Sequence, residues 1–388
     1  MRNFSCIKPA AKPKAINYRG RIMHKHTPRA LLAASVGLGF IATTVHAQST
    51  VTLYGIVDGG FTYTSNQGGK SNYQATAGSE QGSRWGFTGK EDLGGGNAAI
   101  FRLENGFNLQ TGVASANGRI FGRQAWVGLS SDKWGAVTFG RQYNAAQDSL
   151  EPLQVSADTS QYGTHPFDTD DLNNTFRTDN SVKYVTPNFH GLQLNSMYGF
   201  SNNAGNFAMS RSYSVGASYA GGPWRLGAAY VRLDNPAVDT TGAIPSDNYF
   251  TFIKGVTKQQ IYGAGGLYDF GKASLGLMYT STTFDLTPTT QHQTFQNAEA
   301  SIRYQFTPAL RAALGETYTE VTANAKPASW HYWQTTSALQ YFLSKRTDVY
   351  IDLIYQRSSG AVAAIEGTSG ASSSHTQFLA VTGIRQKF

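Results

Sequence analysis

The sequence predicts an all-β protein, a transmembrane β-barrel of sixteen antiparallel strands, and three observations support this fold class. Apolar residues recur at every second position through most of the chain, which is the period of a β-strand. Seven short turns alternate with eight longer polar connections, so sixteen strands are joined in antiparallel order. Aromatic residues gather near strand ends, where a membrane barrel has its interfacial girdles.

The first residues predict export rather than a folded element. From Met23 the segment MHKHTPRALLAASVGLGFIATTVHA combines a basic start, an apolar run and a small-residue end at Ala47. This order is typical of a secretory signal peptide, and the apolar run is short and interrupted by glycine, which argues against a membrane helix. Residues 1–47 are therefore predicted to be a leader and secretory signal peptide, with Met23 as an alternative start. Residues 48–388 are predicted to form one barrel domain.

The charge and cysteine content change once the leader is set aside. The chain carries 32 basic and 24 acidic residues, and the first 47 residues hold eight of the basic residues and none of the acidic ones. The remaining chain has 32 − 8 = 24 basic residues against 24 acidic ones, so a nucleic-acid partner has no support. The single cysteine, Cys6, also lies in the leader, which excludes disulfides and thiolate metal sites from the exported protein.

Alternating side chains identify the individual strands. In AEASIRYQF at 298–306, apolar side chains alternate with Glu299, Ser301, Arg303 and Gln305. Strands of about ten residues exceed the usual length in soluble proteins, and a charged inner face requires a wet interior. A secreted soluble β-sandwich would show the same alternation and is the alternative to the barrel.

The connections fall into two classes by length. Short turns are predicted at 90–97, 130–135, 187–191, 220–223, 269–272, 307–309 and 343–347. Longer polar connections are predicted at 65–82, 109–118, 144–176, 202–209, 233–258, 285–294, 322–330 and 358–373. Short turns at one end and long loops at the other indicate an outer-membrane barrel, because only a closed barrel satisfies every backbone polar group in lipid.

Six segments occur in an order that resembles a known family. They are STVTLYGIVDGG, SRWGFTGKEDLGGGNAAIFRLE, GRQAWVGLSSDKWGAVTFGRQYN, NSVKYVTPNFHGL, YFLSKRTDVY and the closing VTGIRQKF. From Val51 to Phe388 the chain resembles the trimeric general porins of Gram-negative bacteria, in the neisserial and beta-proteobacterial branch. The resemblance implies a homotrimer of sixteen-stranded outer-membrane barrels, each with an inward-folded third loop that narrows a water-filled pore. The implied partners are outer-membrane lipid, lipopolysaccharide, small hydrophilic solutes and ions.

The third long connection, residues 144–176, is the candidate constriction. It contains no lysine or arginine and carries six acidic residues, Asp148, Glu151, Asp158, Asp168, Asp170 and Asp171. A solvated surface loop is the alternative. In the context of the resemblance, we expect an inward loop whose acids face a basic wall across the aqueous path, because charged walls give pores their selectivity.

The basic wall is predicted from the faces of the strands. An outward-facing Trp85 puts Arg84 inward, and Arg177 lies on the polar face of the strand that follows the third connection. Arg123 matches the basic wall of the family in GRQAWVG. An outward Trp126 would place Arg123 inward, but the apolar face of that strand is ambiguous.

Other arginines are assigned lesser roles. Arg141 shares the parity of Val137 and Phe139, so it is not included in the wall unless a bulge intervenes. Four more arginines fall on polar faces and are expected to be wall charges away from the narrowest point, namely Arg102, Arg225, Arg303 and Arg311.

The chain ends on an aromatic residue, Phe388, which closes an alternating segment that starts at Phe378. In the family that the chain resembles, such an ending is the signal for the barrel-assembly machinery. An aromatic residue of the interfacial girdle is the other interpretation, and the two are compatible.

The histidines give no indication of catalysis. His165, His190, His292, His331 and His375 are scattered, and the chain lacks HExxH, paired cysteines and GxSxG. The sequence therefore predicts no enzyme, no cofactor and no metal site.

Together these features predict a water-filled channel for passive diffusion of ions and small hydrophilic solutes. Its constriction would lie between the acidic third loop and Arg84, Arg123 and Arg177. The alternative is a solute-selective porin with a luminal binding site, and a third hypothesis is a structural barrel with a closed lumen. Ion preference stays open, because the local field and not the net charge decides it.

Overall fold

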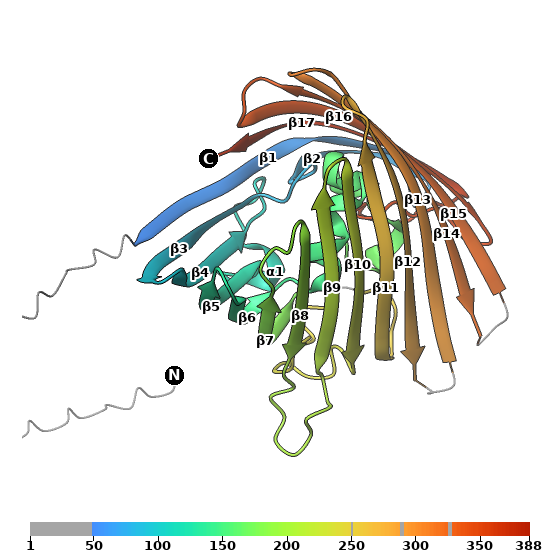
Figure 1. The fold of residues 1–388 in the computed structure, drawn as a ribbon. Helices are drawn as coiled ribbons and strands as arrows, with labels where there is room; N and C mark the ends of the chain where they lie inside the picture. The colour runs from blue at the N-terminus through green and yellow to red at the C-terminus, as the bar shows by residue number, and fades with distance from the viewer. Residues whose placement is uncertain (1–48, 250, 288–290, 325–327) are drawn as a thin grey trace, which may run out of the picture. The chain divides into compact units, whose positions relative to one another are not determined.

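The computed structural model describes residues 49–249, 251–287, 291–324 and 328–388, and the predicted leader lies outside these ranges. One continuous antiparallel sheet curves around a few short helices (Figure 1). The strands are β1 (Thr50–Gln67), β2 (Lys70–Ala77), β3 (Arg84–Gly94), β4 (Asn97–Gly106), β5 (Gln124–Ser131), β6 (Gly135–Gln142), β7 (Thr178–Val185), β8 (Leu192–Gly199), β9 (Ser212–Gly221), β10 (Trp224–Asp234), β11 (Val256–Asp269), β12 (Ala273–Leu286), β13 (Gln291–Thr307), β14 (Leu310–Ala323), β15 (Ala328–Phe342), β16 (Thr347–Ser359) and β17 (Thr376–Lys387). The helices are α1 (Ser115–Gly118), α2 (Ala145–Ser149), η1 (Glu151–Leu153), η2 (Val155–Asp158), η3 (Gln161–Gly163) and η4 (Pro166–Asp168).

The seventeen labelled strands form a closed barrel with sixteen strands around its wall. One edge of β1 pairs with β17, which closes the ring. The other edge of β1 pairs with β3 over its first residues and with β2 over its last ones. β2 and β3 are thus two halves of one wall strand, and the predicted sixteen-stranded antiparallel barrel is confirmed.

The wall strand is broken at residues 78–83. The carboxylate of Asp58 in β1 accepts a hydrogen bond from the Gln81 N–H (2.9 Å), and the Asp58 N–H donates to Ser83 Oγ (3.0 Å). The prediction of a long connection over residues 65–82 is wrong. The turn consists of Gly68 and Gly69, both at positive φ, and β2 follows directly.

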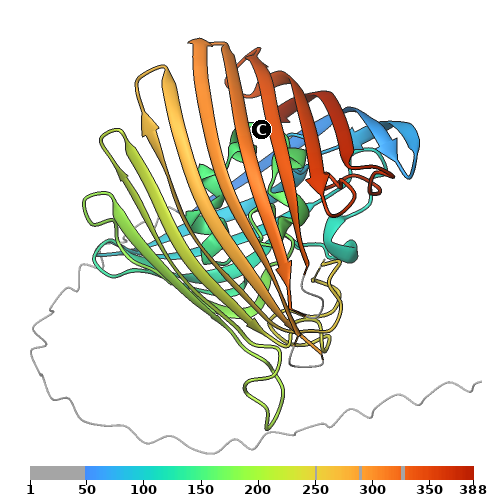
Figure 2. The same ribbon diagram turned by 90° about the vertical axis from the view of Figure 1, so that its right-hand side faces the viewer.

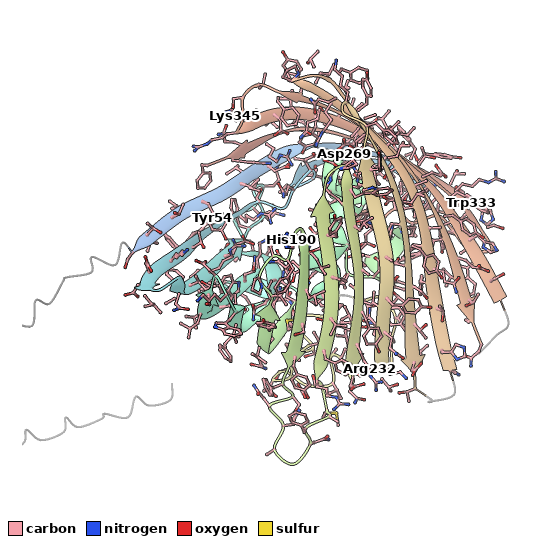
Figure 3. The ribbon with its side chains drawn as sticks, in the orientation of Figure 1. Tyr54, His190, Arg232, Asp269, Trp333 and Lys345 are labelled. Carbon is pink, nitrogen blue, oxygen red and sulfur yellow. The ribbon has the colours of Figure 1, made fainter. Side chains whose placement is uncertain are left out.

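The two faces of the wall differ in polarity. Leu277 of β12 is 71% exposed, whereas Thr280 on the other face is buried. Buried positions of β13 and β15 hold Asn297 and Gln334. Figure 3 shows Trp333 on the outside of the wall. This polarity is inverted relative to a soluble protein and is typical of a barrel that has lipid outside and water inside.

Among the described residues, no helix is long and apolar enough to cross a membrane.

The third connection, residues 143–177, lies against the inner face of the wall. Ser149 of α2 packs on Gly216 of β9 and Gly227 of β10, where an added Cβ would meet Ser149 at 2.6 Å or less. The exposed apolar residues of these strands, Val215 and Leu226, alternate with the two glycines and so lie on the opposite face. Figures 1 and 2 show the helices of this segment enclosed by the strands.

A small apolar core fixes the two ends of the third connection to the wall. Leu150 and Phe176 pack in one cluster with Val231, Leu233 and Ile261, and all five side chains are buried. Burying side chains of this size contributes about 1.5–3 kcal/mol each. The segment is therefore held as part of the barrel interior.

The last residue completes the ring. Phe388 and Gly55 of β1 exchange two backbone hydrogen bonds of 3.0 Å. The Phe388 ring covers Gly55 so closely that a Cβ there would lie 2.3 Å from Cζ, so this position requires glycine.

Candidate functional site

A polar cavity of about 360 Å³ lies between the third connection, the break at 78–83 and the ends of β14 and β17. Its charged lining consists of six basic side chains and three carboxylates. These are Arg84, Arg123, Arg177, Arg311, Arg385 and Lys387, with Glu80, Glu151 and Asp158. The lining therefore carries 6 − 3 = 3 positive charges in excess.

Two of the arginines are free of carboxylate partners. Arg84 is the first residue of β3 and lines the cavity, while Trp85 lies against Phe121. Arg177 donates a hydrogen bond to the Asn174 carbonyl (3.4 Å), and its guanidinium lies 5.5 Å from the ring centre of Tyr143. Neither arginine forms an ion pair within the described ranges. Their full charge is therefore available to the cavity.

Arg123 is held in a fixed position by its partners. Its Nε donates to Glu104 Oε1 (2.7 Å) and its Nη2 to the Tyr143 hydroxyl (2.7 Å). The sequence left open which face of this strand is apolar, and the structure selects the alternative to an outward Trp126. Val127 and Leu129 are the exposed residues of β5, and Arg123 reaches the cavity because it precedes that strand.

Glu151 is a carboxyl group of the cavity that interacts electrostatically with both free arginines, Arg84 and Arg177. It begins η1 and lines the cavity. Burial raises the pKa of Glu151 to about 7, although Arg123, Arg84 and Arg177 act in the opposite direction. This carboxyl group therefore changes its charge near neutral pH.

Asp158 is clamped by two arginines of the wall. Arg303 of β13 and Arg311 of β14 each bind one of its carboxylate oxygens. Arg303 also donates to the carbonyls of Leu153 (3.0 Å) and Gln154 (2.7 Å). The expectation that Arg303 and Arg311 lie away from the narrowest point is wrong, because both contact the third connection.

The other acids of the third connection are engaged elsewhere. Asp148 forms an ion pair with Lys183 of β7, which also donates to the Tyr143 carbonyl (3.1 Å). Asp168 accepts hydrogen bonds from the N–H groups of Asn173 (2.7 Å) and Thr175 (3.1 Å). These two carboxylates hold the chain in place and do not line the cavity.

Asp170 and Asp171 are also buried. Asp170 Oδ2 lies 2.6 Å from His165 Nδ1, and His165 Nε2 lies 3.3 Å from Glu299 Oε2 on β13. Burial lowers the pKa of His165, but Asp170 and Glu299 outweigh burial and raise it to about 10. Asp171 accepts from the Phe176 N–H (2.9 Å). The sequence suggested six acids facing the basic wall, and the structure places only Glu151 and Asp158 at the cavity.

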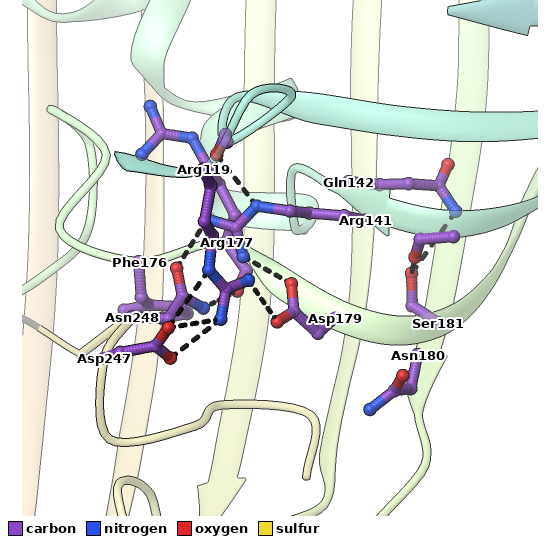
Figure 4. Close-up of polar contacts among 12 residues, drawn as sticks. Arg119, Arg141, Gln142, Phe176, Arg177, Asp179, Asn180, Ser181, Asp247 and Asn248 are labelled. Atoms are coloured by element: carbon purple, nitrogen blue, oxygen red, sulfur yellow. Dashed lines mark hydrogen bonds and ion pairs between the residues drawn. The ribbon is translucent and has the colours of Figure 1, made fainter. Parts of the chain in front are cut away.

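A second cluster of charges joins loops near the cavity (Figure 4). The register shifts after Gly140, whose φ is +133°, and the bulge turns Arg141 inward to pair with Asp179. Arg119 also binds Asp179 (2.7 Å) and makes a bidentate contact with Asp247 (2.7 and 2.8 Å). The sequence left Arg141 out of the basic wall unless a bulge intervened, and the structure contains that bulge.

Several lining residues were missed from the sequence. Glu80 lies in the strand break, a feature with no alternation to reveal its face. Arg385 and Lys387 share the parity of the buried Val381 and alternate with exposed Ile384, a signal that could have identified them. Arg385 also pairs with Glu80, with its Nη1 3.6 Å from Glu80 Oε1.

A closed barrel with an apolar outside, a polar inside and a charged narrow cavity defines a membrane channel of the β-barrel class. A family model described as Gram-negative porin matches residues 30–361, so this chain belongs to the Gram-negative porin family and lies in the outer membrane. Members of this family are channel proteins, which confirms the prediction that the chain is not an enzyme.

The relatives confirm the branch that the sequence motifs indicated. An outer membrane porin protein of Bordetella pertussis is 35% identical over 286 residues, which are 66% of this chain and 69% of the relative. Outer membrane porin protein 32 of Delftia acidovorans is 32% identical over 61% of this chain and 65% of its own length. Major outer membrane protein P.IB of Neisseria lactamica is 26% identical over 91% and 98% of the two chains.

Solved structures share the fold. An anion-selective porin from Comamonas acidovorans superposes with a TM-score of 0.73 at 24% identity, over 88% of this chain and all of the other. The trimer form of OmpT of Vibrio cholerae gives 0.65 at 16% identity, over 88% and 99% of the two chains.

Proposed function

We propose that this barrel is a passive diffusion channel for ions and small hydrophilic solutes, narrowed by the third connection and biased toward anions. The main support for this proposal is the lining of the cavity, in which basic side chains outnumber carboxylates by three. Arg84 and Arg177 dominate the bias, because the charges of Arg311 and Arg385 are offset by Asp158 and Glu80. Fixed charge around a narrow aqueous path raises the local concentration of counterions.

A transverse field accompanies this bias. Glu151 and Asp158 belong to the third connection, whereas Arg84 begins β3 and Arg123 directly precedes β5. Solutes are proposed to be selected by size at this point and by charge through that field. The structurally similar barrel from Comamonas acidovorans is an anion-selective porin, which agrees in sign with the proposal.

Assembly is part of the same proposal. Three barrels form a homotrimer, in line with the resemblance and with the trimer form of OmpT. The leader 1–47 directs export, and Phe388 is the signal for the barrel-assembly machinery. Its position at the ring closure supports this role, because the two hydrogen bonds to Gly55 are made by the last residue of the chain.

The test is conductance of the purified protein in a planar bilayer. We expect stepwise ohmic conductance in groups of three and a reversal potential of anionic sign under a salt gradient. A protein that inserts without conducting would contradict the channel itself. Saturable block of the current by one class of solute would instead favour a solute-selective porin with a luminal binding site.

A further inference from the structure

The side chain of Arg177 is held loosely, although its charge faces the cavity. It donates one long hydrogen bond, to the Asn174 carbonyl (3.4 Å), and its guanidinium lies 5.5 Å from the ring centre of Tyr143. It forms no ion pair with any residue that the structure describes. The place of this charge therefore depends on where the backbone of Arg177 lies.

The backbone of Arg177 is fixed by a side chain from a distant part of the sequence. Asn248 belongs to the connection between β10 and β11, and its Nδ2 donates to the Arg177 carbonyl (Figure 4). Asn248 Oδ1 accepts a hydrogen bond from Arg141 Nη2 (2.6 Å). The Asn248 side chain is buried, so the loss of either contact would leave a buried polar group unsatisfied.

Arg141 connects this asparagine to a second arginine of the cavity. Its Nε donates to the carbonyl of Gly122 (2.8 Å), which directly precedes Arg123. Arg141 and Asn248 together are called the brace below. Through the brace, the backbone before Arg123 and the backbone of Arg177 are joined by three hydrogen bonds.

The connection between β10 and β11 has other anchors to the barrel. Ala243 and Ile244 are fully buried in the apolar cluster of the third connection. The Ala243 carbonyl accepts a hydrogen bond from the N–H of Asp179 (2.8 Å). Asp247 binds Arg119 in a bidentate contact. None of these anchors uses the brace, so the connection is expected to stay in place when the brace is cut.

We infer that the brace positions the charges of the constriction, and that Asn248 is a positioning residue that acts through Arg177. Asn248 does not itself line the cavity. A loop on the side of the long connections thereby determines where a charge of the pore lies. The inference rests on the proposed diffusion channel and adds the group that holds one of its charges. A purely structural asparagine would affect stability and leave the ion preference unchanged.

Asn248→Ala tests the inference because it replaces one neutral side chain by another. The reversal potential is measured well above pH 7, so that Glu151 is charged in every form. If the Arg177 charge moves from about 5 Å to about 8 Å from the ion path, its attraction for an anion in 0.1 M salt falls by about half. Asn248→Ala should therefore shift the reversal potential toward the cation side by about half as much as Arg177→Gln does.

A double-mutant cycle and a matched control separate this effect from general loosening. In the Arg177→Gln background, Asn248→Ala should give no further shift, because the charge on which it acts is gone. Asn180→Gly is the control, since Asn180 Nδ2 donates to the carbonyls of Thr241 (2.7 Å) and Gly242 (3.1 Å) in the same connection. Glycine suits the φ of Asn180, which is +50°. This control should keep the wild-type potential.

Three results of the cycle would overturn the inference. They are a wild-type potential for Asn248→Ala, an undiminished shift in the Arg177→Gln background, and an equal shift for Asn180→Gly.

A second measurement does not depend on conduction. An arginine-specific dicarbonyl reagent modifies the folded barrel, and peptide mass spectrometry gives the rate at Arg177, with the exposed Arg225 as internal reference. We expect Arg177 to react faster in Asn248→Ala than in the wild type and in Asn180→Gly, and Arg225 to react equally in all three. Asn248→Asp keeps the acceptor for Arg141 and removes only the donor, so it should give the same increase even if the alanine variant folds poorly.

The two measurements distinguish the inference from the proposed function. An unchanged rate at Arg177 in both variants of Asn248 would overturn the inference. A wild type that does not conduct, or that prefers cations, would contradict the proposed function alone, because the modification rate still tests the brace.

Discussion

The two unpaired arginines of the cavity give the sharpest prediction. Replacing Arg84 and Arg177 together by glutamine lowers the excess positive charge of the lining from three to one. Because neither arginine forms an ion pair among the described residues, the double variant leaves no buried carboxylate without a partner. The barrel is therefore expected to fold normally. Because Arg84 and Arg177 lower the pKa of Glu151, the current is measured well above that pKa, where Glu151 stays charged in both forms.

The size of the effect follows from Coulomb's law. A guanidinium about 5 Å from a permeating ion contributes about 0.8 kcal/mol in water, and 0.1 M salt reduces this to about 0.5 kcal/mol. Two arginines thus stabilise an anion by about 1 kcal/mol, or about fivefold in occupancy. The same two arginines destabilise a cation by the same amount.

The assay is the reversal potential under a tenfold gradient of potassium chloride, for which the limit of perfect selectivity is about 59 mV. The wild type should lie on the anion side of zero, and the double variant should move toward zero by tens of millivolts on that scale. Arg225→Gln is the control, because Arg225 pairs with Asp269 near a short turn and does not line the cavity. A double variant that keeps the wild-type potential would refute the reasoning.

Three other predictions concern the third connection. Since burial raises the pKa of both Glu151 and Glu80 to about 7, anion preference should rise from pH 8 to pH 6. Glu151→Gln should reduce this change in reversal potential, and Glu151→Gln combined with Glu80→Gln should abolish it. Arg303→Met should cost about 1–3 kcal/mol of unfolding free energy, because it leaves the carbonyls of Leu153 and Gln154 without their donor while Arg311 still pairs with Asp158. It should also increase current noise, whereas the exposed pair of Arg225 is worth about 0–1 kcal/mol. The pKa of His165 is raised to about 10 from an ordinary 6.5, so its stabilisation is complete below pH 6.5 and is lost as the pH rises through 10. Thermal unfolding should show this decline for the wild type and for His190→Gln, and a much weaker one for His165→Gln.

The sequence was sufficient to predict the barrel because the side chains of each wall strand alternate between the two faces, and this alternation is visible locally in the sequence. Alternation assigns the face of each residue in an unbroken strand, so Arg84 and the seven short turns could be located from the sequence alone. The rule fails where the backbone departs from regular pairing. At Gly140 a bulge reverses the parity of Arg141, and at residues 78–83 the strand is interrupted, which brings Glu80 into the cavity.

The acidic third connection shows a second limit. A run of carboxylates predicts negative charge but does not say which oxygens satisfy the backbone. Asp168 and Asp171 adopt positive φ values and accept hydrogen bonds from N–H groups of the same segment, and Asp170 pairs with His165. An aspartate in a loop can therefore bind nearby backbone N–H groups or face the solvent. Composition alone does not distinguish these two arrangements.

The closure of the ring through β1 has a consequence for how the barrel forms. Ile56 pairs with Lys387, so this contact spans 387 − 56 = 331 residues. Closing a loop of that length costs about 5 kcal/mol in chain entropy, from (3/2)RT ln n, and this cost is met before the pairing yields any stabilisation. Both edges of the sheet stay open until the last strand arrives, and open edges invite pairing with other chains. A chain cut short before β17 therefore keeps both edges open and is exposed to aggregation.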